Sequence, residues 1–412
     1  MKKINLVAIT LCLSVLVVPA AYAFSPEDVE PVDIHGFISQ GYLYSTNNNW
    51  LGASENGTWQ FNELGLNFTS MLTDRLRIGM QFFARDVGVI GNDEITVDWA
   101  YADFHVKDWF GIRAGQMKNP QGLYNELRDI DFLRNSVFIP QPVYNEAARD
   151  AFMQTKGIGI YGNIDARAMG MLRYLGLFGT TGIDTEGGTA RIVEEASTAV
   201  ALNLTPGAGG SLLAALIKGD ITGFDVERTY IISLEWQLPV EGLRIAGSFH
   251  RIDYTVDLTL SVAGTPILAM GGTLLEQETW VASIEYTFHD LLLAAEFLRS
   301  YAYGTHIEAW YGMASYRLFD WFALGVYYGE YYPDDSDKSG RSPGLLEDYQ
   351  AWTKTIAGFV RFDINENWLV KGEYQYNDGV ATLSRVENLN NAGFASFHQY
   401  WDFLAFKVTF NF

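Results

Sequence analysis

The sequence is almost free of cysteine, and this absence excludes several classes of site. Cys12 is the single cysteine among the 412 residues, and it lies in an apolar N-terminal segment. If that segment is removed, the mature chain contains no cysteine. A disulfide framework, a cysteine-ligated zinc site and cysteine-based catalysis are therefore excluded for the mature protein.

The N-terminal segment has the layout of a secretory signal peptide. Lys2 and Lys3 precede an uncharged run over residues 4–18, and the Ala-Tyr-Ala at 21–23 forms a small-x-small cleavage site. We expect residues 1–23 to be cleaved and the rest of the chain to be exported. The alternative is an uncleaved anchor, but the run is shorter than the ~20 apolar residues that a spanning helix needs.

The rest of the chain lacks long apolar runs and linkers, and it has few basic residues. Residues 24–412 contain no Pro- or Ser-rich linker and no stretch of helix-spanning length, so we expect them to form one domain. The predicted signal peptide contains two of the 28 basic residues and no acidic residue. The remaining chain therefore has 26 basic and 49 acidic residues, a net charge of −23. This acidity argues against a nucleic-acid partner.

Common catalytic and cofactor-binding patterns are also absent from the sequence. The six histidines are scattered without an H-x-x-x-H pair, and no C-x-x-C-H, Walker-type loop or dinucleotide fingerprint occurs. No Ser-His or Asp-His grouping stands out either. We therefore expect neither enzymatic activity nor a cofactor.

The sequence does contain a recurrent alternation of polar and apolar residues. It runs through "TYIISLEWQ" (229–237), "TWVASIEYTF" (279–288), "WLVKGEYQY" (368–376) and the last ten residues, "FLAFKVTFNF" (403–412). Period two predicts strands with one polar and one apolar face. A soluble β-sandwich has the same period. However, the apolar faces end in aromatic residues, and strands of roughly 10 to 13 residues are typical of a barrel that crosses a membrane.

We therefore predict an all-β fold: a transmembrane antiparallel β-barrel of 18 strands, the first near Val32 to Tyr44 and the last from Tyr400 to Phe412. The segments around 196–220 and 303–317 alternate poorly, which leaves 16 strands as an alternative. A barrel of either size is too wide for side chains to fill, so it should hold water. The last strand should pair with the first, because only a closed sheet leaves no unpaired backbone in lipid.

Short and long connections alternate along the chain, as they do in outer-membrane barrels. Short turns are expected at 72–74, 107–109, 206–210, 238–242, 289–290, 318–321 and 365–367. Longer loops are expected near 44–57, 87–93, 119–153, 179–194, 220–226, 256–275, 331–350 and 378–398.

The longest of these connections, residues 119–153, is called loop 3 below. It contains many apolar residues that need burial, among them Leu123, Tyr124, Phe138, Ile139 and Tyr144. A loop of this composition on the rim of a hollow barrel should fold inward and pack on the wall. It would then narrow the channel, and its charges would influence which solutes enter.

The stretch "IRAGQMKNPQGLYNELRDIDFLR" (112–134) resembles the phosphate-selective porin O/P superfamily, as do "DIHGFISQGYLYS" (33–45) and the final "AFKVTFNF". The resemblance implies a homotrimeric porin of the Gram-negative outer membrane, surrounded by lipid and lipopolysaccharide, whose third loop constricts each pore. It also implies that Phe412 is read by the barrel assembly machinery. Two departures argue against phosphate selectivity: the chain has few basic residues, and Pro120-Gln121-Gly122 replaces the common Pro-Phe-Gly.

Strand phase gives candidates for the lumen. Predicted inward basic residues are Arg75, Arg77, Arg85, Arg113, Arg244, Arg361, Lys371 and Lys407. Predicted inward acidic residues are Glu94, Asp98, Glu235, Glu285, Glu296 and Glu373. At the constriction we expect Arg75, Arg77, Arg85, Arg113 and Lys118, with loop 3 contributing Glu126, Arg128, Asp129, Asp131, Arg134 and Arg149. These opposed charges would create a transverse field; alternatively, they are merely solvated or paired wall residues.

One further stretch, "DSDKSG" (335–340), places Asp335, Asp337 and Ser339 at calcium-loop spacing. Leu346 occupies the position of the closing carboxylate, so a plain hydrophilic loop fits this stretch better than a calcium site.

Together, these patterns predict a porin through which small hydrophilic solutes diffuse passively. Two alternatives remain open: a channel selective for small anions or carboxylates, and a barrel that acts as a sheath around a partner protein.

Overall fold

The computed structural model describes residues 31–88, 91–183, 185, 187–203, 217–302, 304–341, 347–390 and 395–412. The predicted signal peptide (1–23) and the predicted turn at 206–210 lie outside these residues. Among the described helices, none is long and apolar enough to cross a membrane.

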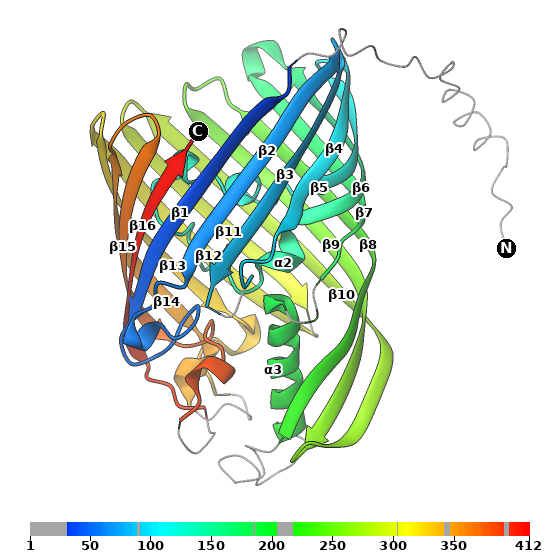
Figure 1. Cartoon of the computed structure of the whole chain (residues 1–412), viewed down its shortest axis with the longest axis vertical. Helices are drawn as coiled ribbons and strands as arrows, with labels where there is room; N and C mark the ends of the chain where they lie inside the picture. The colour runs from blue at the N-terminus through cyan, green and yellow to red at the C-terminus, as the bar shows by residue number, and fades with distance from the viewer. Residues whose placement is uncertain are drawn as a thin grey trace, which may run out of the picture.

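In the described residues the strands form one closed antiparallel barrel (Figure 1). Its sixteen strands are β1 (Asp33–Ser45), β2 (Phe61–Thr73), β3 (Leu76–Val87), β4 (Thr96–Lys107), β5 (Phe110–Lys118), β6 (Gln154–Asp165), β7 (Met171–Thr180), β8 (Ile217–Gln237), β9 (Leu243–Val262), β10 (Thr265–Phe288), β11 (Leu291–Ala302), β12 (Thr305–Phe319), β13 (Phe322–Tyr332), β14 (Thr353–Asp363), β15 (Trp368–Gly379) and β16 (Tyr400–Asn411).

Helices occupy several of the connections, and all of them except the 16-residue α3 are short. They are η2 (Ser54–Asn56), η3 (Asn125–Leu127), η4 (Asp131–Leu133), α2 (Arg149–Phe152), η5 (Arg167–Met169), α3 (Gly188–Asn203), η6 (Asp335–Asp337), η7 (Asp348–Ala351) and η8 (Val386–Asn388).

The predicted all-β barrel is confirmed, but the main count of 18 strands is wrong and the alternative of 16 is correct. One of the two segments that alternate poorly, 196–220, contains the end of α3 and the start of β8 at Ile217. The α3 sequence, "GTARIVEEASTAVALN", is rich in alanine and contains two adjacent glutamates, and these residues favour a helix. The other doubtful segment, 303–317, contains most of β12, a regular strand.

The predicted loops at 220–226 and 256–275 are also wrong, because β8, β9 and β10 continue through them for 21, 20 and 24 residues. Register shifts within these strands disturb the alternation that a sequence pattern detects. The β9–β10 hairpin turns tightly at Ala263 and Gly264, whose φ angles of 52° and 76° fit a two-residue turn. These strands therefore project beyond the barrel, beside α3 (Figure 1).

The barrel closes where β16 pairs with β1, as the sequence predicts. Phe37 lies opposite Asn411, and Gly36 and Phe412 exchange backbone hydrogen bonds of 3.1 and 3.0 Å. Along β16, Lys407 and Thr409 are buried inside, whereas Leu404 and Phe406 are exposed on the outer surface. The alternation at the chain end therefore forms one side of the barrel seam.

Candidate functional site

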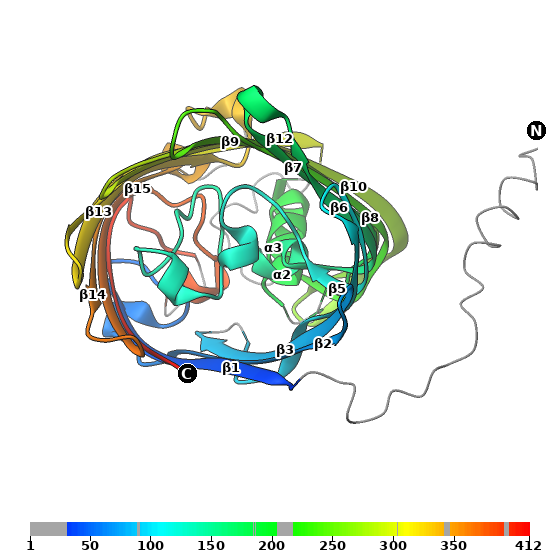
Figure 2. The same ribbon diagram turned by 90° about the horizontal axis from the view of Figure 1, so that it is seen from above.

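Loop 3 folds into the barrel, as predicted, and it also crosses the interior (Figure 2). On one side, the Gly122 N–H donates to Ser248 Oγ of β9 at 3.1 Å, and the Tyr144 hydroxyl donates to Glu296 of β11 at 2.7 Å. On the other side, the Phe138 N–H donates a 3.0 Å hydrogen bond to Glu373 of β15. Loop 3 is therefore held by opposite walls.

Apolar clusters reinforce these polar anchors. Phe138 of loop 3 stacks on Phe61 of β2, with ring centroids 5.2 Å apart, and contacts Trp50 and Phe403. Across the barrel, Leu123, Tyr124, Ile139 and Tyr144 pack with residues of β10 to β12. Burial of such side chains away from water stabilises the inward position of the loop.

Glu146 lies at the centre of a first buried group of charges. Its carboxylate contacts Arg85 of β3, Arg128 Nη2 at 2.8 Å and Arg149 Nη1 at 3.0 Å. Burial alone would raise the pKa of Glu146, but the charges of Arg128 and Arg85 and the hydrogen bond from Arg128 lower it to about 2. The carboxylate therefore stays ionised and binds loop 3 to the wall.

Asp131 is the centre of a second buried group. Its oxygens lie 2.6 Å from Arg134, 2.7 Å from Lys407 and 3.5 Å from Lys371. Thr409 Oγ1 also donates to it at 2.7 Å. Burial opposes ionisation, but the charges of Lys407, Arg134 and Lys371 hold the pKa of this carboxyl far below its usual value.

Asp129 completes the anchoring. It contacts Lys118 of β5 and Arg149 of α2, and Lys118 also lies 3.0 Å from Asp98. The structure therefore brings many of the predicted constriction residues together, but most of them are buried and paired between loop 3 and the wall. These buried, paired members are Arg85, Arg128, Asp129, Asp131, Arg134 and Arg149.

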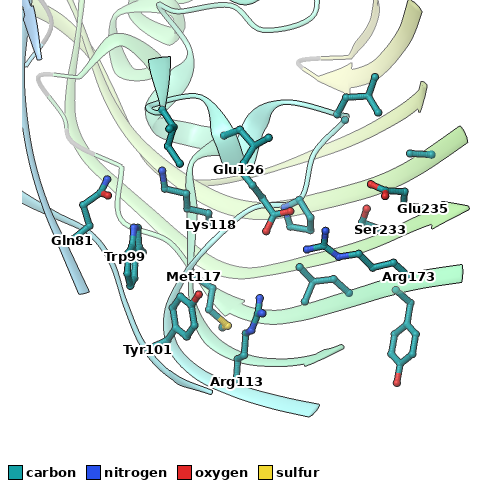
Figure 3. A pocket seen from close by; sticks show the side chains of 18 of the residues that line it. Gln81, Trp99, Tyr101, Arg113, Met117, Lys118, Glu126, Arg173, Ser233 and Glu235 are labelled. Atoms are coloured by element: carbon teal, nitrogen blue, oxygen red, sulfur yellow. The ribbon is translucent and has the colours of Figure 1, made fainter. Parts of the chain in front are cut away.

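A cavity of about 400 Å³ lies between loop 3 and the wall formed by β2 to β9 (Figure 3). Five cationic side chains line it: Arg77, Arg113, Lys118, Arg173 and Arg244. Glu126 of loop 3 and Glu235 of β8 are the acidic residues of its lining. Volumes of roughly 300 to 1,000 Å³ are usual for sites that accept small molecules.

Most of the wall cations of this cavity are paired. Asp103 of β4 lies 3.0 Å from Arg113 and 3.7 Å from Arg77. Arg244 of β9 lies 2.8 Å from Glu285 and 3.1 Å from Glu235. These pairs keep the arginines oriented along the wall and neutralise much of their charge.

Arg113 is also held by aromatic rings. Its guanidinium carbon lies 4.3 Å from the ring centroid of Tyr161 and 5.3 Å from that of Tyr101. Such cation–π contacts add to the ion pair with Asp103 in fixing the position of Arg113.

Arg173 of β7 and Glu126 of loop 3 differ from these residues. In the described part of the chain, neither side chain forms an ion pair or hydrogen bond, with each other or with another residue. Arg173 is exposed and Glu126 is half-buried. Figure 3 shows Glu126 reaching into the cavity from the loop and Arg173 from the wall. The cavity therefore has one unpaired charge of each sign on opposite sides.

Two predicted lumen residues lie elsewhere. Arg75 is exposed in the tight turn before β3, and Glu94 is exposed in the connection between β3 and β4. Neither belongs to the constriction, because both strands are shorter than their alternation suggested.

The remaining predicted lumen residues point inward. Lys371, Glu296 and Glu373 are buried contacts of loop 3, and Arg361 donates to the Phe132 carbonyl of loop 3 at 2.9 Å. These four residues therefore help to anchor loop 3.

Three functional residues were missed from the sequence: Glu63, Asp103 and Arg173. The register between β3 and β4 shifts beside Asp98, so a phase counted from Asp98 assigns Asp103 to the wrong face. Both faces of β7, "MLRYLGLFGT", are largely apolar. The alternation therefore does not show whether Arg173 points into the lumen or outward. Glu63, which contacts Lys407, follows a regular alternation and could have been found from it.

The carboxylates of the calcium-like stretch have other partners. Asp335 lies 2.6 Å from Arg299, and Asp337 accepts hydrogen bonds from the Arg341 N–H and from Ser339. Across the described ranges, no three His, Cys, Asp or Glu side chains are grouped so as to hold a metal ion.

The fold and the cavity define a closed, polar-lined barrel with an inward-folded loop. Among solved structures it is similar to OmpT, an outer membrane protein of Vibrio cholerae, with 10% identity, a TM-score of 0.56 and coverage of 95% of this chain and 100% of that chain. It is also similar to Salmonella typhi OmpF in complex with daunomycin, with 10% identity, a TM-score of 0.55 and coverage of 92% and 97%.

A third similar structure is the anion-selective porin from Comamonas acidovorans, with 12% identity, a TM-score of 0.51 and coverage of 93% and 99%. At these identities the likeness concerns the fold alone. No family model matches the sequence, and no curated protein matches it. Membership of the phosphate-selective porin O/P superfamily therefore stays a prediction.

Proposed function

We propose that the protein is an outer-membrane porin, a water-filled channel through which ions and small hydrophilic solutes diffuse down their gradients. The observation that carries the proposal is the polar cavity beside loop 3, inside a closed barrel whose outer surface is apolar. A barrel of this width holds water, and loop 3 would set the size limit. The similar fold of solved porins supports the proposal.

The test is conductance in a planar lipid bilayer. The purified, folded barrel should give stepwise increases of current in KCl, and reconstituted liposomes should swell with small sugars but not with large oligosaccharides. A boiled sample serves as the control. A barrel that stays folded in detergent, gives no current steps and passes no sugar would contradict the proposal.

A weak preference for small anions is the second candidate. It is favoured by the cavity lining, where five cationic side chains face two acidic ones. Asp103, Glu285 and Asp98 lie within ion-pair distance of four of these cations, so we expect the preference to be modest. A reversal potential in a KCl gradient measures it directly, and cation selectivity would contradict it. A sheath around a partner protein is not favoured, because loop 3 crosses the interior.

We further propose export by a cleaved signal peptide, residence in the outer membrane and assembly as a homotrimer in lipid and lipopolysaccharide. A solved form of the similar Vibrio cholerae OmpT is described as a trimer. The mass of the mature N-terminus and of the native complex tests these points.

A further inference from the structure

The unpaired charges of the cavity point to a solute class more specific than small hydrophilic molecules. Arg77, Arg113, Lys118 and Arg244 all have carboxylate partners in the described structure. Arg173 has none, and Glu126 has no basic partner. An unpaired charge next to a water-filled cavity remains available for a ligand, whereas a paired one must first give up its partner.

Arg173 and Glu126 also face the same space from opposite sides. Arg173 projects from β7, where its neighbours across the sheet are Asn163 and Glu235. Glu126 projects from η3 of loop 3, a segment fixed by the anchors on both walls. The two side chains form no ion pair with each other, although the charge of Arg173 lowers the pKa of Glu126.

Apolar side chains also line the cavity. Leu123 and Leu127 lie on the loop side, and Met117 and Leu175 lie on the wall side. A ligand that fits would carry a carboxylate for Arg173, an ammonium group for Glu126 and a small apolar body between them. Arginine can bind a carboxylate through two parallel hydrogen bonds.

We propose that this cavity is a binding site for small zwitterions, and in particular for free amino acids with an apolar side chain. The proposal rests on the porin function and names the solute that the channel retains most strongly. The carboxylate binds Arg173, the ammonium group binds Glu126, and no bond is made or broken.

The test uses three probes with one carbon skeleton: L-leucine, 4-methylpentanoate, which lacks the ammonium group, and 3-methylbutylamine, which lacks the carboxylate. Each is titrated against the single-channel KCl current, which falls while a probe occupies the channel. Leucine should bind about tenfold more tightly than either analogue, because each charged hydrogen bond contributes at least that factor.

Two variants separate the contacts. Glu126→Gln should weaken leucine about tenfold and leave 4-methylpentanoate unchanged or tighter. Arg173→Gln should weaken both leucine and 4-methylpentanoate but not the amine. Glu276→Gln is the matched control, since Glu276 is exposed in the β10 extension and contacts Arg251. The proposal would be overturned if the unmodified protein bound the three probes equally tightly. It would also be overturned if Glu126→Gln and Arg173→Gln changed the binding of all three probes to the same extent.

The pH dependence of probe binding gives an independent test of the role of Glu126. Burial raises the pKa of Glu126 above its usual value of 4.5, although the charges of Arg173, Arg113 and Lys118 partly offset this and Glu235 adds to it. The preference for leucine over 4-methylpentanoate should therefore disappear on acidification with a midpoint above pH 4.5, and Arg173→Gln should move the midpoint higher. A preference that is independent of pH would overturn the role of Glu126. Absence of any KCl current would instead overturn the porin function itself.

Discussion

At the scale of single residues, the interior of this barrel uses charge in two ways. Glu146 and Asp131 are buried and paired with several cations each, and they hold loop 3 in place. Within the described residues, Arg173 and Glu126 have no ion-pair partner, and both line the cavity beside loop 3. Burial of a charge is unfavourable unless a partner compensates it. Glu146 and Asp131 are therefore structural, whereas Arg173 and Glu126 are available to solutes.

Removal of the Glu146 carboxylate should destabilise the protein strongly. In Glu146→Ala, Arg85 loses its ion pair, and Arg128 and Arg149 each lose one. Loss of one partner from a buried ion pair costs about 3–5 kcal/mol. We expect the free energy of unfolding in urea to fall by about this amount, with Glu276→Gln unchanged as the exposed control. A loss of less than about 1 kcal/mol would show that the network is solvated.

Acid should weaken the same anchor in the unmodified protein. The pKa of Glu146 is lowered from 4.5 to about 2 by folding, so its stabilisation is fully present above pH 4.5 and is lost as the pH falls toward 2. Urea midpoints measured across this range should fall in the unmodified protein. The Glu146→Gln variant, which cannot titrate there, should respond less steeply.

At the scale of elements, loop 3 is the feature that shapes the interior of the barrel. It contacts strands on opposite sides of the barrel and leaves the cavity on the side of β2 to β9. Sequence reasoning predicted its inward position from its apolar content. The partner of each charge could not be predicted, because Glu146 and Arg85, or Asp131 and Lys407, meet only when the loop folds across the interior.

Shortening loop 3 should widen the channel. If a short glycine linker replaces residues 124–146, the KCl conductance should rise severalfold, since the loop no longer obstructs the lumen. The barrel should still fold, because Lys371, Lys407 and Arg85 would then face water. Shortening the connection at 335–340, which lies at the rim, is the control and should change conductance little. An unchanged conductance in the loop 3 deletion would place the constriction elsewhere.

At the scale of the whole molecule, closure depends on the two chain ends. Gly36 and Phe412 exchange backbone hydrogen bonds, and a Cβ on Gly36 would lie only 2.6 Å from the Phe412 ring. Glycine at position 36 therefore lets the terminal aromatic pack at the seam. A barrel without this closure would expose two unpaired strand edges to lipid.

Deletion of Phe412 should impair assembly and leave export intact. The chain loses the two backbone hydrogen bonds between Phe412 and Gly36, together with the terminal aromatic that resembles an insertion signal. Cell fractionation should show less heat-modifiable, folded protein in the outer membrane, while the signal peptide is still removed. Phe319→Ala, which alters an exposed aromatic at the end of β12, is the control. Normal amounts of folded protein after the deletion would refute the role of the terminal residue.

The sequence by itself determined the barrel class, the seam at "FLAFKVTFNF" and the inward fold of loop 3, because alternation and apolar content are local properties that one strand or loop displays alone. Only the tertiary structure decided the number of strands, since α3 and the long β8 to β10 depend on packing against each other. It alone also decided which charges are free. Among the described charges of the cavity lining, Arg173 and Glu126 are the ones without an ion-pair partner, and partners are fixed by how distant segments meet.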